Sequence, residues 1–119
     1  MSDKHLSSTN VGFLIGKTLE QLALGQYEFQ LNFSDNASLS VQQKLVAVTN
    51  IGSFEVNANS PAETKELYFL LGRKIDSAEM DSTKALKLVF DDLSTLTIPG
   101  TQSGYDSYLI WNNGEYIAA

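Results

Sequence analysis

The chain has 119 residues, 43% of them hydrophobic and 18% charged, a composition typical of one globular domain. It has no cysteine, which excludes disulfides, thiolate metal sites and cysteine nucleophiles and favours a reducing, cytoplasmic location. The net charge is −6 and Arg73 is the one arginine, so we expect neither nucleic acid nor a membrane surface as a partner.

The first elements follow a polar start. Residues 1–10 lack the apolar stretch of a signal peptide, so we expect a flexible tail before a single domain over residues 11–119. Val11, Leu14 and Ile15 predict a helical turn that ends at Gly16, and a strand follows near 17–24. A second strand is indicated by period-2 alternation, and its apolar positions are Tyr27, Phe29, Leu31 and Phe33.

The middle of the chain predicts a hairpin and one helix. Ser34-Asp35-Asn36 is a turn before a return strand at 39–41, and residues 45–56 form a further strand pair. A short helix is expected near 61–71, with Ser60 and Glu63 as a capping box around Pro61. Its apolar face would consist of Leu67, Leu70 and Leu71, and Gly72 would end it.

The last third predicts strands again. A strand near 73–80 leads to a hairpin over 86–98 with Asp91-Asp92 in its turn, and Pro99-Gly100 ends it. Tyr108 to Ile117 is a final strand or hairpin, because Asn113-Gly114 is a strong turn signal.

Two segments of the chain follow the same order. Gly16-Lys17 recurs as Gly72-Arg73, and the Leu31–Asp35 hairpin recurs at Leu88–Asp92. We therefore interpret residues 11–43 and 67–100, approximately, as an internal repeat. Chance recurrence of short apolar patterns is the alternative.

The predicted fold class is α+β, built mainly from antiparallel β-sheet. Six to nine strands would form a curled sheet, small barrel or sandwich from the duplicated β-rich unit, with the helix covering one face.

The chemical signals are weak. The pair Asp91-Asp92 could be half of a metal or acid–base site, but a turn explains it better. His5 lies in the polar tail, and Gly16 and Gly72 follow helical patterns instead of preceding a phosphate-binding helix. We therefore expect no catalytic residue, metal site or cofactor.

Aromatic residues gather near the end of the chain, between Gly104 and Trp111. If exposed, they would favour an interaction surface, with Tyr105, Asp106, Tyr108 and Trp111 as its candidates. The alternative is that they belong to the last strand and that alternate side chains point into the core of the protein.

The chain resembles a group of small uncharacterised bacterial domains. The matching motifs are Gly72-Arg73, Leu88–Asp92, Leu96–Ile98 and Tyr105–Tyr108. The group usually has Trp at the position of Tyr108 and often Gly at the position of Leu93. The resemblance implies a role like that of immunity proteins, which neutralise toxins.

The functional expectation is a non-enzymatic protein-binding module, immunity-like, with a partner that is a protein and in particular a basic one. The alternatives are a small-ligand-binding domain with a pocket, or a structural subunit that self-associates as a homo-oligomer through a sheet edge.

Overall fold

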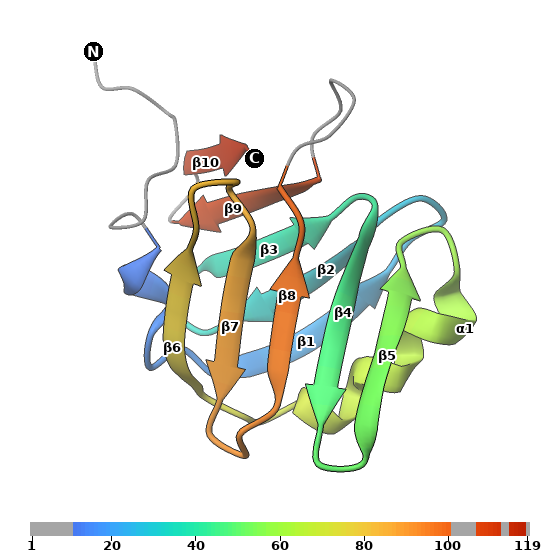
Figure 1. Cartoon of the computed structure of the whole chain (residues 1–119). Coiled ribbons are helices and arrows are strands. Elements are labelled where there is room, and N and C mark those ends of the chain that lie inside the picture. Colours follow the sequence, from blue (N-terminus) through green and yellow to red (C-terminus); the bar gives the residue numbers. More distant parts are fainter. Residues whose placement is uncertain (1–10, 101–106, 113–114, 119) are drawn as a thin grey trace.

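The computed structural model describes residues 11–100, 107–112 and 115–118. In these residues two five-stranded antiparallel sheets pack face to face, with their strands crossing (Figure 1), in the orders β1-β2-β3-β9-β10 and β5-β4-β8-β7-β6. The strands are β1 (Leu19–Leu24), β2 (Phe29–Phe33), β3 (Ala37–Val41), β4 (Lys44–Thr49), β5 (Gly52–Asn57), β6 (Ile75–Met80), β7 (Leu86–Phe90), β8 (Thr95–Ile98), β9 (Tyr108–Asn112) and β10 (Glu115–Ala118).

The antiparallel, mainly β class with a short helix is confirmed, and the arrangement is a sandwich. Each sheet has two edge strands in the described part of the chain, so neither closes into a barrel. The described residues form ten strands instead of six to nine, because the final segment contributes two paired strands, β9 and β10. The core lies between the sheets, where alternate residues of facing strands are buried: Leu31, Leu39 and Ile110 from one sheet and Leu45, Leu88 and Leu96 from the other.

The predicted helix is present but differs in form. Only α1 (Pro61–Thr64) is α-helical, and the 3-10 helix η2 (Lys65–Leu70) continues it. The capping box is wrong, because the Ser60 side chain caps nothing and Glu63 accepts hydrogen bonds from Asn57 instead. The prediction that the helix covers one sheet face is also wrong, because α1 lies against β5 and η2 against β1, edge strands of different sheets.

The 3-10 geometry decides which apolar residues are buried. With three residues per turn, positions i and i+3 share a face, and Leu67 and Leu70 are both buried. Leu71, expected on that face, is extended and 42% exposed. Gly72 follows with φ +85°, the left-handed conformation expected of it. No helix in the described ranges is long and apolar enough to span a membrane.

Two units of the chain have the same element order. The 3-10 helix η1 (Gly12–Leu14) precedes β1, β2 and β3 as η2 precedes β6, β7 and β8. Gly16 has φ +88°, close to the value at Gly72, and a register shift interrupts the pairing of both β1 and β6 near their first residues. That the units arose by duplication stays a prediction.

The units meet through reciprocal backbone hydrogen bonds. The Gly16 amide donates to the Ile75 carbonyl at 2.8 Å, and the Gly72 amide donates to the Leu19 carbonyl at 2.8 Å. In the same way, the Leu19 amide donates to the Arg73 carbonyl, and the Ile75 amide donates to the Lys17 carbonyl. This pairing holds β1 and β6, and therefore the two sheets, together at one corner.

The hairpin that follows each unit in the chain joins the sheet of the other unit. Strand β4 pairs with β8, so the β4–β5 hairpin completes the sheet of β6, β7 and β8. Strand β9 pairs with β3, so the β9–β10 hairpin completes the sheet of β1 and β2. Both sheets therefore contain strands from both halves of the chain.

Candidate functional site

Two grooves lie beside equivalent turns of the two units, the turn after β2 and the turn after β7. The Asp35 groove has a volume of about 570 Å³ and is lined by Glu20, Asn32, Phe33, Asp35, Asn36, Ala37 and Ser38. The Leu93 groove has a volume of about 800 Å³ and is lined by Val48, Thr49, Asn50, Ile51, Phe54, Glu66, Phe69, Asp92, Leu93 and Ser94. The first lining is mostly polar, whereas the second is largely apolar.

Large apolar side chains of the Leu93 groove are unusually exposed. Ile51, in the β4–β5 turn, is 92% exposed, and Leu93, in the β7–β8 turn, is 80% exposed. Val48 and Phe69, on β4 and η2, add partly exposed apolar surface between them. Scattered apolar residues are normal on a protein surface, but a contiguous group around a groove marks a contact site for another molecule.

The backbone at Leu93 is unfavourable for leucine. The three-residue loop 91–93 closes with the Leu93 amide donating to the Phe90 carbonyl and the Phe90 amide donating to the Ser94 carbonyl. Such loops place their last residue in the left-handed region, where Gly or Asn is preferred. Leu93 has φ +72°, whereas the equivalent position of the first unit holds Asn36 at φ +61°. Leucine there costs about 1–2 kcal/mol, which its exposed side chain does not recover by packing.

We expect Leu93→Asn to raise the free energy of unfolding by about 1 kcal/mol, because Asn tolerates positive φ and the lost side chain is exposed. The measurement is urea denaturation followed by circular dichroism. The matched control, Asn36→Leu, creates the same strain in the first unit and should lower the free energy by a similar amount. A decrease on Leu93→Asn would show that Leu93 stabilises the fold.

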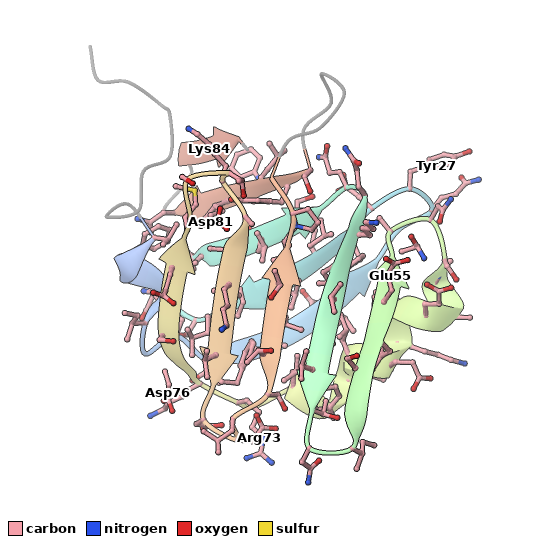
Figure 2. All side chains as sticks on the ribbon, viewed as in Figure 1. Tyr27, Glu55, Arg73, Asp76, Asp81 and Lys84 are labelled. Carbon is pink, nitrogen blue, oxygen red and sulfur yellow. The ribbon has the colours of Figure 1, made fainter. Side chains whose placement is uncertain are left out.

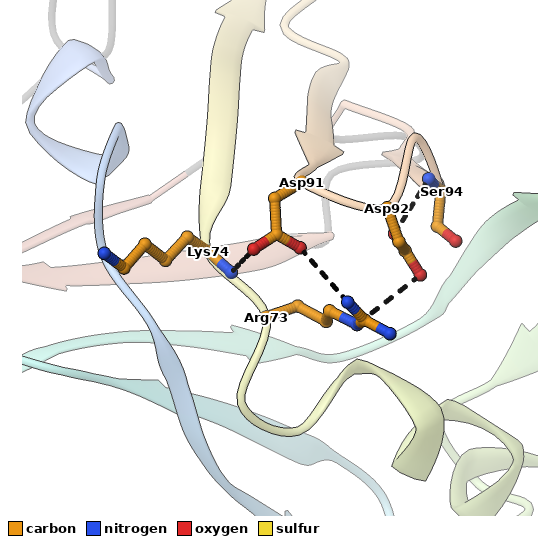
Figure 3. Close-up of polar contacts among 5 residues, drawn as sticks. All are labelled: Arg73, Lys74, Asp91, Asp92 and Ser94. Carbon is orange, nitrogen blue, oxygen red and sulfur yellow. Dashed lines mark hydrogen bonds and ion pairs between the residues drawn. The ribbon is translucent and has the colours of Figure 1, made fainter.

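Acidic groups dominate the charge near this groove. Its lining includes the carboxylates of Glu66 and Asp92 and no basic residue. Arg73 lies between Asp91 and Asp92 (Figure 3). One oxygen of each carboxylate is 3.8 Å from a nitrogen of the Arg73 guanidinium. One cation therefore faces two anions, and the cluster keeps a net negative charge.

The Asp91-Asp92 pair serves the turn, as the turn interpretation predicted. Asp92 accepts a hydrogen bond from the Ser94 amide at 3.0 Å, and Asp91 accepts one from the Lys74 amide at 3.3 Å. Within the described ranges, no three His, Cys, Asp or Glu side chains gather as they would around a metal ion. His5 lies outside these ranges.

The structure separates the four residues predicted as an interaction surface. Tyr108 is fully buried, and its hydroxyl donates to the Lys84 carbonyl at 2.8 Å. It therefore contributes no surface. Trp111 is half-buried on β9, opposite Ser38 of β3. Tyr105 and Asp106 lie outside the described residues, as do Asn113-Gly114 and the tail.

Sequence reasoning missed Ile51, Phe69 and Leu93. One signal was present: an apolar leucine follows two aspartates in a turn, at a position where glycine or asparagine is usual. The other residues of the groove lie far apart in the chain, and only the exchange of hairpins brings the β4–β5 turn beside the β7–β8 turn.

Comparison with protein-family models, curated proteins and solved structures finds no match to this chain.

Proposed function

We propose that this chain is a non-enzymatic protein-binding module that holds its partner in the Leu93 groove. The observation that carries the proposal is Leu93 itself, which is 80% exposed and left-handed in a turn that favours Asn or Gly. Leu93 strains the backbone of the free protein and its side chain is exposed. A partner against which this side chain packs would account for the presence of leucine at this position. An immunity-like role, in which the partner is a toxin, is one form of this function.

The charge supports a basic partner. The net charge of −6 and the carboxylates beside the groove attract a positively charged protein from a distance. Such steering increases the association rate more than it slows dissociation. We expect the association rate constant to fall steeply as salt rises from about 0.05 to 0.5 M, because the Debye length shortens. A rate that does not change with salt would contradict a basic partner.

The test uses two variants as bait in extracts of the cells that make the protein and compares how much partner protein each variant captures. The double variant Ile51→Asn/Leu93→Asn removes the apolar rim of the groove. It should raise the dissociation constant of the complex at least about tenfold, which is the effect of losing a central contact. The control is Tyr27→Asn, because Tyr27 is 72% exposed in the β1–β2 turn. It lies far from Arg73 (Figure 2), whose ion-pair partner Asp92 lines the groove. A partner retained equally by both variants would place the binding surface elsewhere.

A small-ligand site is the second candidate, supported by the size of the groove. A volume of about 800 Å³ lies within the range of small-molecule sites. Its polar groups converge poorly, however, because the Thr49 hydroxyl is already engaged with the Gly52 carbonyl and the Ile51 amide. A metabolite that raised the melting temperature of the wild type but not of the double variant would favour this candidate.

A further inference from the structure

Strand β5 borders the Leu93 groove and is an edge of its sheet, since β4 is its one partner among the described strands. In an antiparallel pair, the backbone groups of alternate residues point toward and away from the neighbouring strand. The Asn57 amide donates to the Glu63 side chain, so it points away from β4, and the Ala58 amide donates to the Gln43 carbonyl. Counting back by two from Asn57, the amides of Glu55 and Ser53 also point away from β4.

The two ends of this edge differ. At the Asn57 end, Glu63 accepts hydrogen bonds from the Asn57 backbone and side-chain amides, both at 3.0 Å. These bonds, the backbone one first, lower the pKa of Glu63, so the group that covers this end stays ionised at neutral pH. At the other end Ser53 and Glu55 are exposed, and β5 there pairs with β4 alone.

Two of the other described edges, β1 and β6, are better protected. Strands β1 and β6 each carry a register shift, and backbone hydrogen bonds join their first residues to the opposite unit. Bulges and covering segments are the usual means by which proteins prevent further pairing at an edge. Strand β5 pairs with β4 in regular register over its whole length, and its charged residue, Glu55, forms an exposed ion pair with Lys44 at 3.4 Å.

The side chains of β5 connect this edge to the groove. Phe54 lines the groove and Val56 is buried, so these residues face inward, while Ser53 and Glu55 face outward. In a strand added beside β5, the residue opposite Phe54 would lie on the groove side. The residue opposite Glu55 would lie on the outer face, next to a carboxylate.

We propose that an extended segment of a basic partner protein adds to the sheet beside Ser53 and Glu55 and places an apolar side chain in the Leu93 groove. This inference rests on the proposed function and specifies its binding mode. The segment alternates an apolar residue with Lys or Arg, because Glu55 lies on β5 beside it and Glu66 and Asp92 line the groove. Backbone pairing supplies affinity and the groove supplies specificity.

A second copy of this chain fits this edge less well. Antiparallel pairing of two β5 strands across Ser53 and Glu55 would bring the two Glu55 carboxylates close together, and like charges facing each other destabilise a sheet. Each copy also carries a net charge of −6, which opposes association at low salt.

The first experiment selects binding peptides from a random phage-displayed library on the wild-type protein, with Leu93→Asn as the counter-selection target. We expect peptides with an apolar residue between basic residues. Acidic peptides, or no peptide that depends on Leu93, would overturn the inference. The second of these outcomes would also contradict the proposed function.

The second experiment separates strand addition from binding in the groove. Ser53→Pro removes an outward amide, which an edge strand tolerates, and should weaken the selected peptide at least about tenfold by calorimetry. Ser53→Ala keeps the amide and should bind within about twofold of the wild type. If Ser53→Pro binds normally while Leu93→Asn does not, the groove binds its partner without strand addition, and only the inference fails.

N-methylation of the peptide makes the result independent of how Ser53→Pro folds. Methyl groups on the peptide amides that face β5 should abolish binding, whereas methyl groups on the intervening amides should not. Equal effects at both sets of positions would overturn strand addition. A dimer of the free protein that Ser53→Pro dissociates, seen by sedimentation, would make a second copy the occupant of the edge.

Discussion

Neither half of the chain, residues 1–59 or 60–119, is expected to fold alone, whereas an equimolar mixture is expected to assemble into the native structure. The reason is the exchange of hairpins. In the first half, the β4–β5 hairpin would lose β8, its neighbour in the sheet. In the second half, the β9–β10 hairpin would lose β3. Each half would keep a three-stranded sheet whose core face, with Leu39 or Leu96 at its centre, would be open to water.

Circular dichroism and size-exclusion chromatography of the halves, separate and mixed, test this expectation. The separate halves should show no cooperative thermal transition. The mixture should elute as a one-to-one complex with the spectrum of the intact chain, which is the control. A half that unfolds cooperatively as a monomer would show that each unit is an independent domain and that the exchanged hairpins are peripheral.

Replacement of Tyr108 should produce one of the largest effects of a single substitution in the described chain. Tyr108 is fully buried, and Tyr108→Ala should lower the free energy of unfolding by about 3–5 kcal/mol, the range for a buried aromatic residue. That loss is a large part of the total stability of a domain of this size, about 5–15 kcal/mol. Tyr108→Phe keeps the ring and removes only the hydroxyl, which contacts the Lys84 carbonyl and the Met80 sulfur, so it should cost about 1 kcal/mol in urea denaturation.

The pH dependence of stability gives an independent test of the buried hydroxyl. Burial, and then the nearby Asp81 carboxylate, raise the pKa of Tyr108 well above its ordinary value of 10. The folded protein therefore keeps this proton at pH values where the unfolded chain loses it. The free energy of unfolding should then fall as the pH rises above about 10, and more steeply for the wild type than for Tyr108→Phe. Parallel curves would indicate that the Tyr108 hydroxyl is open to water.

Much of the fold could be predicted from local patterns. The alternation in 29–33 and 86–90 identified β2 and β7, because a strand buried on one face repeats every two residues. Gly16 and Gly72 marked the ends of the helical turns, and both have the positive φ that glycine adopts at little cost. The 3-10 form of η2 could not be predicted, since Leu67 and Leu70 fit both helical periods and only the exposure of Leu71 distinguishes them.

Most of the candidate site could not be predicted from the sequence. The aromatic residues near Tyr108 were its most prominent surface candidates, yet the pairing of β9 with β3 buries Tyr108 between the sheets. The same alternation that can expose an aromatic residue can bury it, and the partner strand decides which face is inside.

By itself the sequence determined the class of the fold, the positions of most turns and the acidic charge, because these depend on neighbouring residues and on composition. Only the tertiary structure decided that the hairpin after each unit completes the sheet of the other unit. That pairing depends on which distant strands bury the most apolar surface together, a quantity that no local pattern contains. It also brings Ile51 and Leu93, from hairpins far apart in the chain, to the two sides of one groove.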